Sequence, residues 1–408
     1  MHGSSGVEVL VAAVDPRDVG SRRQRLLGSV KGSEPGPTVV CCAALHGDEP
    51  SGILALGRVF DELECRRPPL RGEVVGVAGN LAALIEGRRF ITADLNRHWL
   101  AENLERARAA APGELAHEDR ELRELLDTLH ELFARARGAV YFLDLHTSSA
   151  AGDPFVCVGD TLRNRAFAEQ FRVPVILGLE ECIDGSLLEY VNDLGHVTVG
   201  VEAGQHRAGS SVDRHESFVW LALVAAGAVW PADVPDLEGH RRRLSDASRQ
   251  LHGFLEVHHR HPIVAADEFA MLEGFSNFQS VAAGDLLARD RSGEIRAPES
   301  GRILLPLYQG LGSDGYFIAR EVSSFWLRVS SGLRRLGLDS LLHWLPGVRR
   351  HPDREATLII DTGLARWFAL EAFHLLGYRK RRSEGGKLVV SRRRFDHNLP
   401  AGGGHAPR

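Results

Sequence analysis

The stretch Thr38–Glu49 (TVVCCAALHGDE) joins an unbroken apolar run to a polar cluster. Small and β-branched residues fill Thr38–Leu45, and such a run is typical of a strand buried on both faces of a parallel sheet. The run ends at a turn signal, His46-Gly47, and the residues from Pro50 to Arg58 and beyond then have a helical pattern. A strand followed by a helix is the repeating unit of an α/β fold.

The same alternation continues over about the first 235 residues. Further buried strands are expected at Glu73–Ala78, Ala139–Leu145 and Val197–Val201. Glu118–Arg137 is expected to be a helix, because five leucines recur on one side of it at helical spacing. We therefore expect an α/β fold with a mixed, mostly parallel sheet flanked by helices, and ligands at the carboxyl ends of its strands.

The pattern changes after Pro231–Pro235. A charged helix is expected from Leu237 to about Glu256, and frequent Gly, Pro and Asp turn signals then favour short strands. Ala356–Ser391 has the pattern of strand, helix and strand. The expected parts are an α/β domain (1–236), a connecting helix (237–260), a β-rich domain (261–345), an α+β extension (346–395) and a disordered tail (396–408).

The bulk composition is that of a soluble globular protein. Of the 408 residues, 44% are hydrophobic and 25% are charged, and the formal net charge is −5. A small negative charge argues against nucleic acid as the main partner. The segment from Pro346 onward is basic, which is more typical of a solvated surface than of a site for an anionic partner.

The cysteines and the apolar runs indicate a cytoplasmic protein. The 5 cysteines are odd in number and have no CxxC spacing, so reduced thiols are expected rather than a disulfide framework. The N-terminus lacks the features of a signal peptide. The longest apolar run, Phe218–Trp230, is too short to span a bilayer and suits a buried helix.

Four short polar clusters carry the chemistry, and most of them follow an expected strand. In chain order they are His46–Glu49, Asp94–Arg97, Asp144–Thr147 and Glu202–Gly204. Imidazole nitrogen and carboxylate oxygen are good zinc ligands, and a catalytic zinc site uses three protein ligands with one position open for water. The clusters therefore predict zinc-assisted hydrolysis, with one zinc ion per chain.

His46, Glu49 and His146 supply the three expected zinc ligands. Asp144 is placed to accept a hydrogen bond from the free ring nitrogen of a ligand histidine. Each of these residues could instead have a purely structural role. The spacing His-x-x-Glu at His46 and Glu49 is common by chance. A glutamate can cap a helix N-terminus, and Asp144 can cap the turn that follows it.

Glu202 closes an apolar run, where a buried carboxylate is costly without a partner or a role. Its expected role is general base toward water and then proton donor to the leaving group, and the alternative is a salt-bridged glutamate at a strand end. Arg89 could polarise the scissile carbonyl, Arg97 with Asn96 could hold a substrate carboxylate, and Asp94 could brace their loop. The roles of Arg89, Arg97 and Asn96 follow from the N–H donors that these side chains offer.

The ordered motifs HGDE, RxxxxDLNR, DLHT and VEAG resemble the succinylglutamate desuccinylase/aspartoacylase family, which comprises zinc hydrolases related to the metallocarboxypeptidases. The resemblance covers roughly Thr38 to Pro235 and extends into the β-rich part at Ala297-Pro298, Leu304–Gln309 and Asp314–Phe317. It implies a zinc carboxypeptidase-like fold for the catalytic domain and the same residue roles.

The resemblance implies a deacylase that acts on the amide bond of a small carboxylate-bearing molecule. The net charge and the short apolar runs predict neither nucleic acid nor membrane as a partner. In aspartoacylases a further arginine shortly before the catalytic glutamate holds a second substrate carboxylate. The stretch Tyr190–Gly200 contains no arginine, so N-acetylaspartate and succinylglutamate are not the expected substrates. An esterase or carboxypeptidase with the same site, or a non-catalytic zinc-containing binding protein, remains the alternative. The sequence leaves the oligomeric state open.

Overall fold

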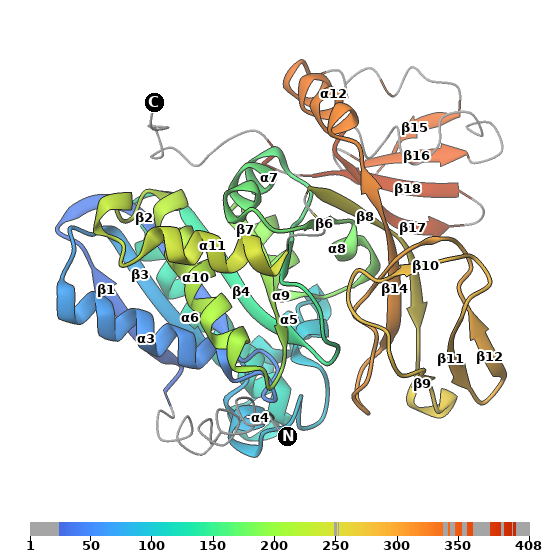
Figure 1. The fold of residues 1–408 in the computed structure, drawn as a ribbon, viewed down its shortest axis with the longest axis horizontal. Coiled ribbons are helices and arrows are strands. Elements are labelled where there is room, and N and C mark those ends of the chain that lie inside the picture. The colour runs from blue at the N-terminus through green and yellow to red at the C-terminus, as the bar shows by residue number, and fades with distance from the viewer. Residues whose placement is uncertain are drawn as a thin grey trace, which may run out of the picture.

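The structure, a computed structural model, describes most of the first 337 residues and parts of the C-terminal segment (Figure 1). The described residues are 24–248, 251, 253–337, 342, 347–352, 357–361, 376–384, 387–393 and 395–396. The helix expected between the two strands of Ala356–Ser391 and nearly all of the disordered tail expected at 396–408 lie outside them.

An eleven-stranded mixed sheet runs through the molecule in the order β1-β3-β2-β4-β7-β5-β6-β8-β14-β13-β10. Its strands in chain order are β1 (Leu26–Lys31), β2 (Glu34–Ala43), β3 (Arg71–Ala78), β4 (Val140–Ser148), β5 (Phe155–Cys157), β6 (Val175–Leu177), β7 (Val197–Gln205), β8 (Phe254–Pro262), β10 (Ser280–Val281), β13 (Gly301–Leu304) and β14 (Asp314–Val322). The neighbours β3, β2, β4 and β7 are parallel, so their carboxyl ends meet at one edge.

Helices cover both faces of this sheet, as the alternation of strands and helices predicts. They are α3 (Ser51–Arg66), α4 (Leu81–Glu86), α5 (Ala101–Ala109), α6 (His117–Arg135), α7 (Leu162–Ala168), α8 (Leu179–Cys182), α9 (Leu187–Asp193), α10 (Gly209–Ala226) and α11 (Leu237–Ala247). Side chains of β2 alternate between the faces, since Val39 and Cys41 pack in the cluster with α3 and α10, whereas Val40 and Cys42 pack with α6.

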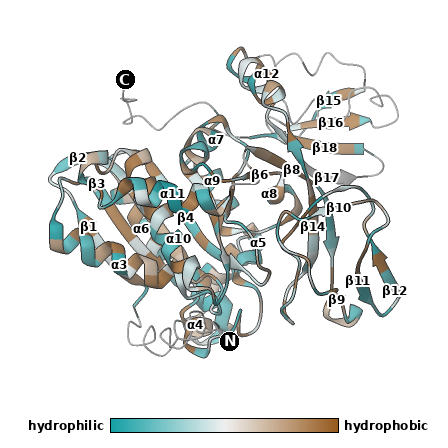
Figure 2. Ribbon diagram, in the orientation of Figure 1, coloured by the Kyte–Doolittle hydropathy of each residue, from teal (hydrophilic) through white to brown (hydrophobic). Residues whose placement is uncertain are grey.

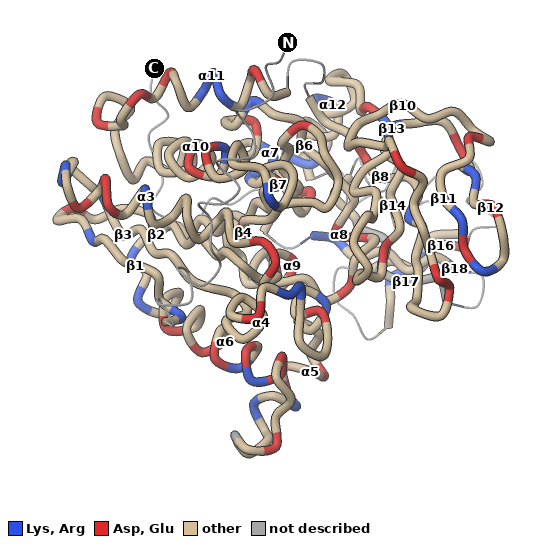
Figure 3. Tube along the Cα trace, turned by 60° about the horizontal axis from the view of Figure 1, so that its bottom comes forward, with Lys and Arg blue, Asp and Glu red and all other residues tan. Residues whose placement is uncertain are grey.

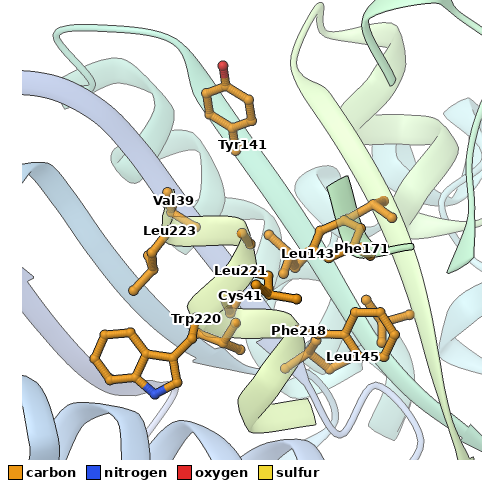
Figure 4. Packing of buried hydrophobic residues seen from close by; sticks show 14 of the residues in the cluster. Val39, Cys41, Tyr141, Leu143, Leu145, Phe171, Phe218, Trp220, Leu221 and Leu223 are labelled. Carbon is orange, nitrogen blue, oxygen red and sulfur yellow. The ribbon is translucent and has the colours of Figure 1, made fainter. Parts of the chain in front are cut away.

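The two helix faces that the sequence marks as apolar are buried. On α6, the leucines at 122, 125, 126, 129 and 132 all lie in the core. On α10, Phe218, Trp220 and Leu223 pack against Val39 and the middle of β4 (Figure 4). Apolar residues are concentrated on these inner elements (Figure 2). None of the helices within the described residues combines the length and the apolar character needed to cross a membrane.

The connecting helix is shorter than expected. It ends at Ala247 rather than near Glu256, and Phe254–Pro262 forms strand β8 instead. The C-cap Ser248 already has a non-helical backbone (φ −120°, ψ 25°), and backbone hydrogen bonds then pair β8 with β6 and β14. The main sheet therefore continues into the β-rich part, and the boundary expected at residue 261 falls inside a strand.

The β-rich part extends the sheet and adds a small second one. The small sheet contains β9 (Ala270–Met271), β11 (Leu286–Asp290) and β12 (Gly293–Arg296). Helix α12 (Ser324–Arg335) follows β14 and leads to a third sheet in the order β15-β16-β18-β17. The strands of this third sheet are β15 (Val348–Arg350), β16 (Thr357–Asp361), β17 (Tyr378–Glu384) and β18 (Lys387–Arg392).

Candidate metal centre and active site

The turn after β2 fixes the first polar cluster. Gly47 packs so closely on the backbone of Ala83 that a Cβ at this position would lie 2.1 Å from its carbonyl carbon, so only glycine fits. The Gly47 N–H donates a hydrogen bond to the Arg89 carbonyl oxygen at 3.2 Å. The turn that carries His46 and Glu49 is thereby tied to the segment that carries Arg89.

Strands β4 and β7 carry the next two clusters side by side. Asp144 and His146 are two residues apart on β4, so their side chains project from the same face. His146 and Glu202 are register partners in the parallel pairing of β4 and β7. Because β2 pairs with the other edge of β4, the carboxyl ends of three parallel strands bring the clusters together.

A buried glutamate on α6 holds the loop that carries Arg89 and Arg97. The Glu118 carboxylate on α6 accepts hydrogen bonds from the backbone N–H groups of Ile91 (2.6 Å) and Thr92 (2.9 Å). Burial raises the pKa of Glu118, but these donors outweigh it and hold the pKa below its usual range. The loop then enters a short 3₁₀ helix, η1 (Leu95–Arg97), which is capped by the Asp94 side chain.

The side chains of His46, Glu49 and His146 converge on one point. One nitrogen or oxygen from each lies within 4.8 Å of the others, and all three residues are buried. His46 Nδ1 lies 2.8 Å from Glu49 Oε1, and His146 Nδ1 lies 3.3 Å from Glu49 Oε2. The two oxygens of Glu49 therefore each contact the Nδ1 atom of one imidazole.

The other nitrogen of each ring faces a carboxylate. His46 Nε2 donates to Asp94 Oδ1 at 3.1 Å, and His146 Nε2 lies 3.0 Å from Asp144 Oδ2. Carboxylates in this position orient a ligand histidine and leave its other nitrogen free for a metal. The three donors and their partners therefore fit a zinc ion, which prefers imidazole nitrogen and carboxylate oxygen.

The charges of the site perturb its pKa values strongly. Burial raises the pKa of Glu49, but His46 and His146 outweigh it and hold that pKa well below its usual range. Burial, with help from the Glu49 charge, raises the pKa of Glu202 to about 8 despite the opposing effects of His146, His46 and Arg89. Two carboxylates of one site thus have pKa values far apart, as a ligand and a proton carrier require.

Arg89 and Arg97 pair with different acids at the site. Arg89 Nη2 donates to Asp94 Oδ2 at 2.9 Å, and Arg89 Nη1 lies 3.7 Å from Glu49 Oε1. Arg97 Nη2 donates to Asp314 Oδ2 at 2.8 Å, which is a contact with strand β14. Asn96 Oδ1 accepts from the Leu187 N–H at 3.0 Å and so holds the start of α9.

The predicted site residues other than Asp94 line one cavity of about 150 Å³. Its lining includes His46, Glu49, Arg89, Asn96, Arg97, Asp144, His146 and Glu202. Within the described residues, Glu202 Oε2 is buried and accepts no hydrogen bond, as expected of a carboxylate that awaits water or substrate. The structure thus brings eight of the nine predicted site residues together in the lining, Glu202 among them, and the ninth, Asp94, contacts His46 at 3.1 Å.

Other lining residues were not predicted from the sequence. Thr147 donates its backbone N–H to Glu49 Oε2 at 2.7 Å, and its Oγ1 lies 2.8 Å from His206 Nδ1. His206 Nε2 in turn donates to Gln309 Oε1 at 2.9 Å. The position of His206, four residues after Glu202, was the available signal. Gln309 and Asp314 come from the β-rich part, and no local pattern places them here.

The comparisons with known proteins agree with this fold and site. Residues 35–218 match the family model for the succinylglutamate desuccinylase/aspartoacylase catalytic domain. A succinylglutamate desuccinylase of Burkholderia thailandensis is 30% identical over 120 residues, which are 28% of this chain. The match spans 32% of the length of that relative.

Two solved structures share the fold over most of the chain. The product-bound ectoine utilization protein EutE (DoeB) of Ruegeria pomeroyi has a TM-score of 0.51 and 21% identity, over 72% of this chain and 87% of that protein. A succinylglutamate desuccinylase/aspartoacylase of Rhodobacter sphaeroides has a TM-score of 0.53 and 18% identity, over 72% and 88%. Motifs, site and fold agree, and residues 35–218 of this chain match the catalytic domain of the succinylglutamate desuccinylase/aspartoacylase family.

Proposed function

We propose that the protein is a zinc-dependent hydrolase that cleaves an amide bond in a small, carboxylate-bearing molecule. The observation that carries the proposal is the convergence of His46, Glu49 and His146 in one cavity with Glu202, whose Oε2 has no hydrogen-bond partner among the described residues. A zinc ion, when bound, supplies a Lewis acid and lowers the pKa of water toward neutrality. One ion per chain is proposed, because the described residues contain one such donor group.

Glu202 carries the proton in this proposal. It takes a proton from the attacking water and returns it to the leaving amine, which requires a carboxylate whose pKa lies near the working pH. Burial raises the pKa of Glu202 above that of an ordinary carboxyl group, which favours its holding the proton between these two steps. The position of Glu202, directly beside His146 in the sheet, keeps the two groups in a fixed relation.

Arg89, Arg97 and Asn96 handle the substrate. Arg89 polarises the scissile carbonyl and stabilises the negative charge that develops on its oxygen. Arg97 and Asn96 hold the substrate carboxylate, so that the amide is presented in one orientation. Asp144 and Asp94 keep the two histidine rings oriented through their Nε2 atoms.

The proposed catalytic domain comprises residues 1–236, and the β-rich part supplies one wall of the cavity through Leu305, Leu307 and Asp314. We also propose a cytoplasmic location, because all five cysteines are free thiols, as is usual in a reducing compartment.

The test begins with the metal. The purified protein is depleted of metal with a chelator and titrated with Zn²⁺, and turnover is followed on matched amides, esters and C-terminal peptides. The proposal predicts one zinc ion per chain and zinc-dependent turnover of the amides. Faster turnover of the esters or peptides would instead support an esterase or a carboxypeptidase. Zinc binding without turnover on the whole panel would support a binding protein, and absence of zinc binding would refute the proposal.

A further inference from the structure

The two guanidinium groups that line the cavity are each already paired with an acid. Among the lining residues, Arg89 and Arg97 supply the guanidinium groups. Arg89 is paired with Asp94, and Arg97 is paired with Asp314, an acid that itself lines the cavity. Within the described lining, once one substrate carboxylate lies on Arg97 and Arg89 serves the scissile carbonyl, no other guanidinium is left for a second carboxylate.

A further carboxylate lines the cavity. Glu180 on α8 lines the cavity, and its side chain is 7% exposed. Glu180 and its neighbour Glu181 share the guanidinium of Arg393, which comes from the C-terminal segment. A second substrate carboxylate near this wall would lose its water, and Glu180 and Asp314 already pair with Arg393 and Arg97, the guanidinium groups that could offset that cost.

Another part of the wall is apolar, beside polar lining residues that include Ser149, Ser186, His206 and Gln309. It is formed mainly by Leu179, Ile183, Leu188, Leu305, Leu307 and Phe317. The first three lie on or next to α8 and α9, and the others come from the β-rich part, so the apolar wall is built from both parts of the chain. A wall of this kind favours uncharged, branched or aromatic groups, which lose water at little cost.

We infer that the substrate carries one carboxylate and, in the remainder of the molecule, an uncharged apolar group. The inference rests on the proposed function, and it names the substrate class as an N-acyl amino acid with one negative charge rather than two. The carboxylate lies at Arg97, and the apolar group, on the acyl side or on the amino-acid side, lies against Leu188 and Phe317.

The test compares substrates that differ in the second charge. With the zinc-loaded protein, kcat/KM is measured for N-acetyl-leucine and N-hexanoyl-glycine, which have one carboxylate, and for N-acetyl-aspartate and N-succinyl-leucine, which have two. The better singly charged substrate is expected to exceed both dianions by about 100-fold. A dianion that equals or exceeds the singly charged substrates would overturn the inference while leaving the proposed function intact. No turnover of any of the four would refute the proposed function itself.

Two variants with a matched control test the walls directly. Leu188→Arg adds a cation to the apolar wall, and Asp314→Asn removes an acid beside Arg97. Each is expected to shift the ratio of kcat/KM for dianion over singly charged substrate upward by at least about 10-fold. Leu188→Met keeps an apolar side chain of similar volume and should leave the ratio unchanged. If Leu188→Arg fails to fold, Asp314→Asn still decides, and a ratio unchanged in the folded variants would contradict the inference.

Discussion

Arg97 Nη2 donates a hydrogen bond to Asp314 Oδ2 over 2.8 Å, and this contact joins the loop after α4 to strand β14. The same carboxylate accepts a hydrogen bond from Arg260 on β8. Residues separated by 217 positions thus form one edge of the cavity, so the shape and the charge of the proposed site depend on how the β-rich part lies on the catalytic domain.

Replacement of Arg97 should weaken substrate binding. Because Arg97 holds the substrate carboxylate in our account, Arg97→Ala is expected to raise KM for the best N-acyl amino acid by about 10–100-fold, the loss of a charged hydrogen bond. Zinc content should stay the same. Arg260→Gln is the matched control, since Arg260 also pairs with Asp314 but does not line the cavity. A similar KM increase in both variants would contradict the role of Arg97.

Asp144 should control the affinity for zinc. Asp144 Oδ2 lies 3.0 Å from His146 Nε2, and loss of such a partner usually weakens metal binding by about 10–100-fold. Asp144→Asn is therefore expected to raise the Kd for Zn²⁺ by that factor in a competition titration with a chromophoric chelator. Asp153→Asn, a half-buried aspartate outside the donor group, serves as the control. Equal affinities in Asp144→Asn and the unmodified protein would refute the orienting role.

The elements with a strong local pattern could be predicted from the sequence, and the others could not. Helix α6 follows from its leucine spacing, and β2 and β4 follow from continuous apolar runs. Strands β5 and β6 have three residues each, which is too short for any periodicity. The end of α11 was misplaced because the pairing of β8 with β6 and β14, rather than local propensity, decides the conformation of Phe254–Pro262.

The same division holds for the candidate site. The polar clusters at the ends of β2, β4 and β7 could be brought together in advance, because parallel neighbouring strands end at one edge of a sheet. The pairing of Arg97 with Asp314 and that of Arg393 with Glu180 could not, because they depend on how distant parts of the chain pack. The sequence shows an excess of basic residues in the C-terminal segment. One of them, Arg393, is buried and pairs with Glu180. Elsewhere both signs of charge are interspersed on outer helices such as α6 (Figure 3).

A buried ion-pair cluster around Asp160 should govern stability in acid. Asp160 pairs with Arg165 and with Arg334 of α12, and Arg334 also contacts Asp396. Burial raises the pKa of Asp160, but Arg165, Arg334 and Arg393 outweigh it and hold the pKa well below its usual range. The folded state therefore binds fewer protons than the unfolded state, whose aspartate pKa is about 3.9, and this contribution is lost as the pH falls below that value.

Asp160→Asn is accordingly expected to lower the free energy of unfolding at pH 7 by about 3 kcal/mol, because it leaves the buried Arg334 without that charge. Its stability should also change less than that of the unmodified protein between about pH 4 and pH 2. Denaturant unfolding at several pH values measures both effects. Asp119→Asn, which removes an exposed pair with Arg106, should cost less than about 1 kcal/mol. Equal losses in the two variants would contradict this account.

Arg393 should position the cavity wall from the C-terminal segment. It pairs with both Glu180 and Glu181, so Arg393→Gln frees α8 and is expected to raise KM by about 10-fold while zinc content and kcat stay close to normal. The split between KM and kcat distinguishes this role from general destabilisation. Arg350→Gln, an exposed position on β15 of the same C-terminal sheet, is the control. Loss of zinc or of kcat in Arg393→Gln would show that the residue acts differently.

The central claim is that Glu202 moves the proton in a zinc-assisted hydrolysis. Its most direct test is kcat/KM of Glu202→Gln on the best N-acyl amino acid, measured with the zinc content of the same sample. Removal of a general base predicts a fall of about 10²–10⁴-fold with one zinc ion per chain retained, whereas Asp61→Asn on the exposed face of α3 should have no effect. Activity of Glu202→Gln within a few-fold of the unmodified protein, at full zinc occupancy, would contradict the claim.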